Sequence, residues 1–169
     1  MTPLILSIIA DDRPGIVEQV ADAISAHQGN WLESSLANLA GKFAGIVRLE
    51  VPEAQRDALC EALDALTSKG VKISIDATDA RVSAHKARVH ITVTGSDRPG
   101  IVREITALLA RQHVNVHELH TQCESAPMSG DHLFVASLKV VLPDGMDEHD
   151  LSDTLESISS DLVVDTEVL

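Results

Sequence analysis

Positive charge is scarce in this sequence. Its 169 residues include 13 lysines and arginines against 26 aspartates and glutamates, which gives a formal net charge of −13. The few basic residues are also scattered along the chain. A nucleic-acid-binding surface needs clustered lysine and arginine to displace the counterions of the phosphates. The composition therefore argues against direct contact with nucleic acid.

Long apolar runs, a basic N-terminal segment and a set of paired cysteines are also lacking. Apolar runs such as residues 4–6 are far shorter than the roughly 20 residues that span a membrane. The N-terminus has no basic segment ahead of an apolar stretch, so no secretory signal is indicated. Cys60 and Cys123 fall at positions that do not correspond between the two halves of the chain, so no disulfide framework is expected. We expect a cytoplasmic protein with no membrane contact.

Motifs of catalysis are absent as well. The sequence has no nucleophile elbow, phosphate-binding loop or HExxH motif, so we expect no enzyme and no cofactor. An active site assembled from scattered residues stays an alternative. His117 and His120 lie near Cys123, but residues three apart on a regular strand point to opposite faces. We expect no metal site unless a β-bulge brings these side chains together.

An internal repeat is the main feature that is present. Residues 12–17 and residues 97–102 share the sequence DRPGIV, at an offset of 85 residues. The same offset places Asn30 on Asn115, so the repeat extends beyond the six matched letters. A chain of this length can hold two small domains of roughly 80 residues each. We predict a first domain over residues 1–80, a linker over residues 81–87 and a second domain over residues 88–169.

Hydrophobic periodicity predicts the same order of elements in both repeats. In the first, strands over residues 4–10, 31–39, 43–51 and 71–75 alternate with helices whose apolar faces begin at Ile16 and Leu59. In the second, strands begin near residues 89, 114, 134 and 162, and residues 123–132 form a longer hairpin loop. A β-α-β-β-α-β order with right-handed crossovers predicts an α+β, ferredoxin-like fold. Each domain should have a four-stranded antiparallel sheet with two helices on one face.

The repeated turn joins the first strand of each domain to its first helix. Asp97 has the chemistry of a helix N-cap, which would place Pro99 in the first helical turn. The N–H of Gly100, unshielded by a Cβ, would then be open to a ligand carboxylate at the positive end of the helix. Asn30 and Asn115 are expected beside the turn, where their amides could also contact a ligand. The alternative is an ordinary strand-to-helix turn, with each asparagine capping a loop.

The strand, DRPGIV turn, helix and following asparagine resemble the ACT domain, a small regulatory module. Two such domains with nothing else attached resemble the glycine cleavage system transcriptional repressor family. The resemblance implies an amino-acid effector bound where two ACT domains meet, and control exerted through protein contacts. The positions that match the effector site are Asp12, Arg13, Gly15, Ile16, Asn30, Asp97, Arg98, Gly100, Ile101 and Asn115.

Two hypotheses for function follow from this resemblance. In the first, the protein senses a small amino acid, with glycine and serine as first candidates, and changes its contact with a transcription activator. In the second, the turns serve only to pair ACT domains, and no small molecule binds. Exposed sheet edges and an uncovered sheet face lead us to expect a homo-oligomer in either case.

Overall fold

The computed structural model describes residues 1–78, 88–125 and 130–169, and it separates into two compact units, Met1–Val82 and Ser83–Leu169. The predicted linker, residues 81–87, lies outside the described residues. The exact domain bounds therefore stay a prediction.

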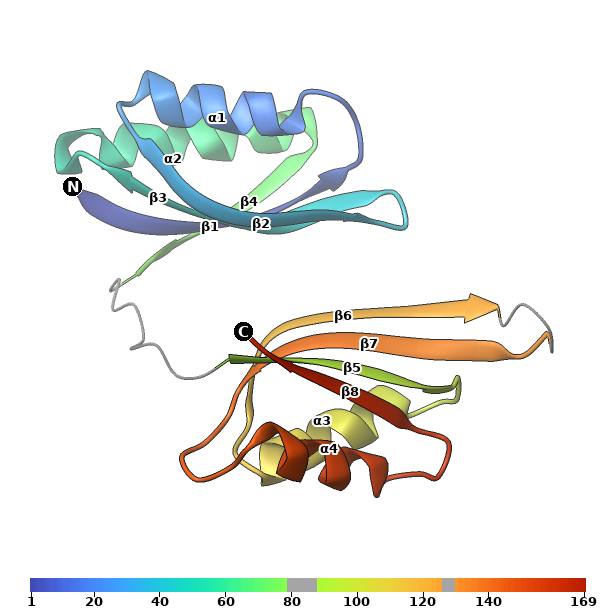
Figure 1. The fold of residues 1–169 in the computed structure, drawn as a ribbon. Coiled ribbons are helices and arrows are strands. Elements are labelled where there is room, and N and C mark those ends of the chain that lie inside the picture. The colour runs from blue at the N-terminus through green and yellow to red at the C-terminus, as the bar shows by residue number, and fades with distance from the viewer. Residues whose placement is uncertain (79–87, 126–129) are drawn as a thin grey trace. The chain divides into compact units, whose positions relative to one another are not determined.

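The first unit has the predicted order of strands and helices (Figure 1). Its elements are β1 (Thr2–Asp11), α1 (Ile16–Ala26), β2 (Asn30–Leu39), β3 (Lys42–Val51), the short 3-10 helix η1 (Glu53–Gln55), α2 (Arg56–Ala65), the 3-10 helix η2 (Leu66–Lys69) and β4 (Val71–Ala77). The strands pair antiparallel in the order β2-β3-β1-β4, and α1 and α2 cover one face of the sheet.

The second unit repeats this arrangement. Its elements are β5 (Arg88–Ser96), α3 (Ile101–Arg111), β6 (Asn115–Ser125), β7 (His132–Val141), α4 (Glu148–Glu156) and β8 (Val163–Val168). The sheet order is β6-β7-β5-β8, which is the order of the first unit at equivalent positions. The prediction of two ferredoxin-like domains in tandem is confirmed.

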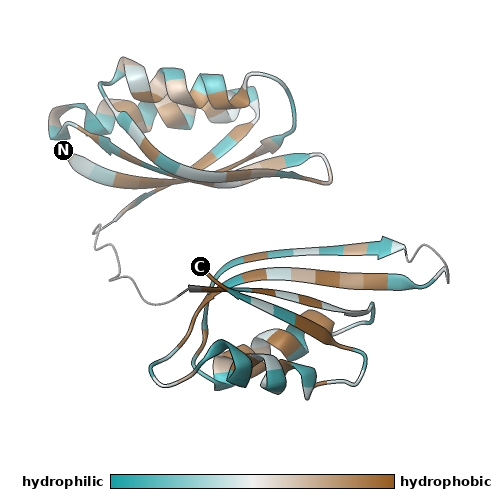
Figure 2. Cartoon of the chain, in the orientation of Figure 1, coloured by the Kyte–Doolittle hydropathy of each residue, from teal (hydrophilic) through white to brown (hydrophobic). Residues whose placement is uncertain are grey.

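Each unit has a separate apolar core between its sheet and its helices. In β1 the buried residues Leu4, Leu6, Ile8 and Ala10 alternate with more exposed ones. β7 has the same alternation of buried and more exposed residues. Figure 2 shows hydrophobic residues on the strands and on the helices of each unit, with hydrophilic residues among them. Alternate side chains of a strand point to opposite faces, so each sheet packs one face against its helices and leaves the other free of them.

The edge strands β2 and β6 carry a matching irregularity. The register of β2 against β3 shifts between Trp31 and Glu33, and that of β6 against β7 shifts between Val116 and Glu118. These positions correspond at the offset of 85, so the β-bulge is part of the repeated fold. The bulge in β6 falls at His117.

The hairpins differ between the units. In the first, Ala40 and Gly41 have positive φ angles of 50° and 80°, as a two-residue hairpin turn requires. In the second, the loop predicted over residues 123–132 overlaps both strands, because β6 ends at Ser125 and β7 begins at His132. Cys123 and Glu124 pair with β7 as their equivalents Asn38 and Leu39 pair with β3, and the pair of Ser125 with His132 extends the hairpin by one position. Residues 126–129 lie outside the described part of the chain.

Candidate functional site

The repeated turn ends in a glycine with left-handed backbone conformation. Gly15 has a φ of 89° and Gly100 a φ of 91°, and each directly precedes its helix. In the second copy the Ile101 N–H donates to the Arg98 carbonyl oxygen, at 3.3 Å between nitrogen and oxygen. Proline at the second position and glycine with positive φ at the third define a type II β-turn.

The N-cap prediction for Asp97 is wrong. The caps are Gly15 and Gly100, and neither helix has a side-chain capping bond. Proline and the left-handed glycine form a turn ahead of the helix, so Pro99 precedes the first helical residue instead of lying within the first turn. The Gly100 carbonyl oxygen accepts the first helical hydrogen bond, from the Glu104 N–H at 3.0 Å.

The aspartates tie each turn to the neighbouring hairpin. The Asp12 N–H donates to the Gly41 carbonyl, and the Asp97 N–H donates to the His132 carbonyl, both at 2.9 Å. The Asp12 carboxylate also accepts a hydrogen bond from the side-chain amide of Asn38.

A cysteine replaces that asparagine in the second unit. Cys123 corresponds to Asn38 at the offset of 85 and faces Asp97. Desolvation by neighbouring atoms, together with the negative charge and hydrogen bond of Asp97, raises the pKa of the exposed Cys123 thiol. A raised pKa disfavours the thiolate, which is the reactive form of cysteine.

The two arginines of the turns have different partners. Arg13 Nη2 donates to the Lys69 carbonyl oxygen at 2.7 Å. Arg98 forms a bidentate salt bridge with Glu104: Nη1 donates to Oε1 at 2.7 Å, and Nη2 donates to Oε2 at 2.6 Å. This pairing raises the pKa of Arg98 and lowers the pKa of Glu104. The equivalent arginines therefore bind different groups: a backbone carbonyl in the first unit and a carboxylate in the second.

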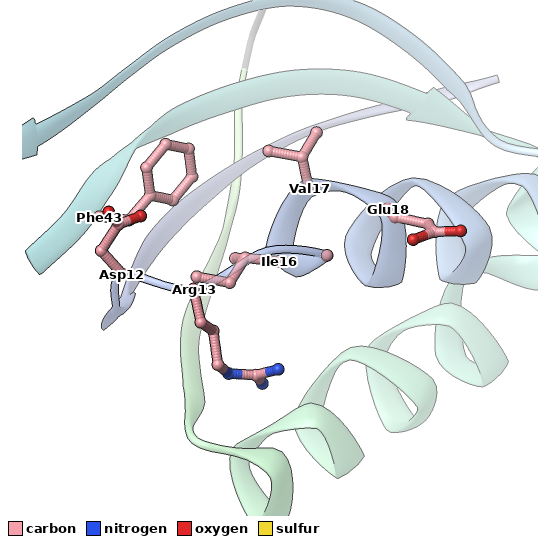
Figure 3. A pocket seen from close by; sticks show the side chains of 7 residues that line it. Asp12, Arg13, Ile16, Val17, Glu18 and Phe43 are labelled. Atoms are coloured by element: carbon pink, nitrogen blue, oxygen red, sulfur yellow. The ribbon is translucent and has the colours of Figure 1, made fainter.

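Each turn borders a pocket. The first has a volume of about 230 Å³ and is lined by Asp12, Arg13, Gly15, Ile16, Val17, Glu18 and Phe43 (Figure 3). The Arg13 side chain points away from Phe43 and Val17. The second has a volume of about 530 Å³ and is lined by Pro99, Gly100, Arg103, Glu104, Ala107, Leu108, Arg111 and Ile158. Of the site residues expected in the second unit, Gly100 alone is among those that line this pocket.

The asparagines do not lie beside the turn of their own unit. Asn30 opens β2 as expected, but it pairs with Glu50, which pairs in turn with Pro3. Pro3 is eight residues from Asp11 along β1, or about 26 Å. Asn115 is placed in the same way, because it pairs with Val141 opposite Arg88 at the start of β5. The expectation that these side chains adjoin the turn is wrong within one unit.

This separation follows from the crossover. Since β1 and β2 are both antiparallel to β3, they run parallel to each other. The helix α1 therefore returns the chain to the end of the sheet where β1 began, and β2 starts there.

The shared motif does not reveal the charged residues on the helix that follows each turn. Glu18 lines the first pocket, and Arg103 occupies the equivalent position in the second. Gln19 likewise corresponds to Glu104, and Ala26 to Arg111. Comparing the repeats at the offset of 85 beyond the matched letters would have shown these differences.

Histidine and acidic residues do not assemble into a metal centre in the described part of the chain. Across residues 1–78, 88–125 and 130–169, no group of three or more histidine, cysteine, aspartate or glutamate side chains is placed to hold a metal ion. In the same ranges no helix is long and apolar enough to cross a membrane.

A sequence model of the ACT domain matches residues 2–77 and 87–122, more than half of the chain. The chain belongs to the ACT domain family. The glycine cleavage system transcriptional repressor of Escherichia coli (strain K12) is 27% identical to it over 128 residues. That match covers 73% of this chain and 66% of the relative, just under two thirds of its length.

Solved structures share the fold of the chain over nearly its whole length. The crystal structure of an unknown protein from Galdieria sulphuraria is 28% identical and superposes with a TM-score of 0.82, covering 99% of this chain and 98% of the other. A crystal structure of a candidate glycine cleavage system transcriptional repressor superposes with a TM-score of 0.74 over 99% of this chain and 97% of the other. At 16% identity, the latter likeness concerns the fold alone.

Proposed function

We propose that this tandem ACT protein is an amino-acid-responsive regulator of the glycine cleavage system repressor type. The observation that carries the proposal is the repeated turn, which borders a pocket in each unit. The similarity to the Escherichia coli repressor supports the regulatory class. Neither unit contains a recognised catalytic motif, which favours a regulator over an enzyme.

The effector is a small amino acid, with glycine and serine as first candidates, held at the turn. In the first unit, Asp12, Arg13, Gly15 and Ile16 line the pocket. In the second, Asp97, Arg98 and Ile101 shape the turn around Gly100. Asn30 and Asn115 lie far from the turn of their own unit, so one ligand can touch both a turn and an asparagine only if the asparagine comes from another ACT domain. A homo-oligomer would supply such a domain.

Control of transcription would pass through a protein partner, such as a transcription activator, rather than through DNA. The net charge of −13 opposes binding to phosphates. An acidic surface is compatible with contact to a basic face of another protein, which electrostatic complementarity would favour.

The proposal is tested by thermal unfolding of the full chain against the twenty amino acids. A ligand that binds only the folded state raises the unfolding midpoint. We expect a rise with glycine or serine that is lost in Gly100→Val and reduced in Asn115→Ala. Gly145→Val is the matched control, because Gly145 also has a positive φ, of 88°, and also has open space around it, but lies outside both pockets. No rise with any amino acid would reject the effector role.

The alternative, an ACT-domain interaction protein without an effector, is favoured by the exposed edges. β2 and β6 have ten and eleven residues, lie at the edge of their sheets and are largely exposed. Such edges pair readily with another chain. A protein that oligomerises and captures a partner in pull-down experiments, with no amino-acid response, would fit this alternative.

A further inference from the structure

α1 and α3 differ in charge at two equivalent positions of their exposed faces. Glu18 corresponds to Arg103, and the uncharged Ala26 corresponds to Arg111; all four residues are exposed. Glu18 and Arg103 each line the pocket at the turn of their own unit. The two pockets therefore differ in the sign of their charge as well as in volume.

Arg103 and Arg111 set the charge of the second pocket. The pocket has one acidic residue, Glu104, and the guanidinium of Arg98 neutralises it through two hydrogen bonds. Within the described ranges, neither Arg103 nor Arg111 takes part in an ion pair. Two positive charges therefore face the pocket in a protein that is otherwise strongly acidic.

The wall between the arginines is apolar. Ala107 and Leu108 lie between Arg103 and Arg111 on α3, and Ile158, just after α4, also lines the pocket. Leu108 and Ile158 pack against the core of the unit and are only partly buried. The two arginine Cα atoms are about 12 Å apart along the helix axis. At this separation the two long side chains can reach the same small molecule.

We propose that the pocket beside α3 binds a small dicarboxylate, and that the pocket beside α1 does not. One carboxylate pairs with Arg103 and the other with Arg111, since guanidinium groups bind carboxylates through two parallel hydrogen bonds. The aliphatic body of the ligand packs against Leu108 and Ile158. The volume of about 530 Å³ suits a small molecule. This inference rests on the proposed function only for the location of the pocket at the repeated turn.

The first pocket lacks what a dicarboxylate needs. Asp12 and Glu18 give it negative charge, and Arg13 is turned to the Lys69 carbonyl. Its volume of about 230 Å³ is also less than half that of the second. Because interactions between exposed charges decay within about 8 Å at physiological ionic strength, these local groups decide which pocket attracts an anion.

The test is isothermal titration calorimetry of the full chain with sodium glutarate and L-glutamate, at an ionic strength matched with sodium chloride. We expect one glutarate per chain. Arg103→Gln and Arg111→Gln should each weaken binding about tenfold or more, since each removes a charge-assisted pair. Glu18→Gln, the matched change on α1, should leave the affinity unchanged. All three side chains are exposed, so the variants should fold, and circular dichroism melting verifies this.

The inference is overturned if glutarate does not bind, if binding survives both arginine substitutions, or if two molecules bind per chain. A retained response to glycine or serine without glutarate binding would reject the inference and leave the proposed function standing. Arginine-dependent glutarate binding without that response would support the inference and reject glycine and serine as effectors. If only an acidic protein, and no glutarate, required the two arginines, the pocket would be a protein-docking groove and the inference would fail.

Discussion

Gly15 and Gly100 hold a backbone conformation that other residues adopt at a cost. Their φ angles of 89° and 91° lie in the left-handed region. An added Cβ on Gly100 would meet no atom within 4 Å, and one on Gly15 would meet only the ends of Gln19 and Glu18 at 3.8 Å. Space is therefore not the reason for glycine at these positions. The type II turn requires glycine for its left-handed conformation, and residues of this turn line the pocket.

Gly15→Ala should destabilise the first unit by about 1–2 kcal/mol, because an L-residue in the left-handed region pays this steric cost. Gly15→Asn should cost less, since asparagine tolerates that conformation. Urea unfolding followed by tryptophan fluorescence measures the effect. The chain has one tryptophan, Trp31, which packs against the core of the first unit and so reports that unit. Equal losses for alanine and asparagine would contradict the conformational explanation.

The elements that enclose the turn are anchored differently in the two units. In the first, the Arg13 guanidinium reaches the carbonyl of Lys69, at the end of η2. In the second, the Ser96 N–H at the end of β5 donates to the Asp161 carboxylate at 3.0 Å. Both contacts join the turn region to the connection that leads into the last strand. The sequence repeat is therefore preserved in the backbone and not in these side-chain contacts.

Asp161→Asn should remove a pH-dependent part of the stability of the second unit. The hydroxyl of Ser159 and the N–H of Ser96 lower the pKa of Asp161 to about 2. A carboxyl whose pKa is lower in the folded state stabilises the fold above its ordinary pKa of 3.8, and this contribution is lost as the pH falls toward 2. The variant should thus be less stable than the native protein at pH 5, and the difference should shrink between about pH 4 and 2.

Urea unfolding by circular dichroism across this pH range measures that difference, with Trp31 fluorescence as the reference for the first unit. Asp165→Asn, which removes the same charge from β8, is the matched control. A difference for Asp161→Asn that does not change between pH 5 and 2 would show that the carboxylate is not the anchoring group.

Element order was predictable because two independent signals agreed. Apolar residues at helical spacing, such as Ile16, Val20 and Ile24, are the residues that α1 buries, and the repeat gave each assignment a second copy. Side-chain roles were less predictable. The helix starts after Gly100 because a left-handed glycine breaks the helix path, whereas cap chemistry alone pointed to Asp97. Arg98 pairs with Glu104, whereas the equivalent position in the first unit is Gln19. A motif that the two repeats share does not reveal such a difference.

At the scale of the whole molecule, charge limits the ways in which this protein can act. Several basic side chains already have acidic partners within their own unit: Lys42 with Asp11, Arg48 with Glu33, Arg98 with Glu104 and Lys139 with Glu118. Arg103 and Arg111 are on one helix and line the same pocket. The chain thus has positive charge enough for a small anion and too little for a polyanion.

The full chain should not bind double-stranded DNA, even at low salt. Each phosphate that a protein neutralises contributes about 0.9 to the slope of log affinity against log salt, and stable complexes make many such contacts. Thirteen lysines and arginines, scattered among 26 acidic residues and four of them already in ion pairs, cannot supply such a cluster of contacts. Fluorescence anisotropy of a labelled 30-base-pair duplex, about three helical turns, in 50 mM sodium chloride measures this, with a basic DNA-binding protein as positive control. Saturable binding that weakens steeply with added salt would contradict regulation through protein contacts alone, and its loss in Arg103→Gln and Arg111→Gln would place the DNA at α3.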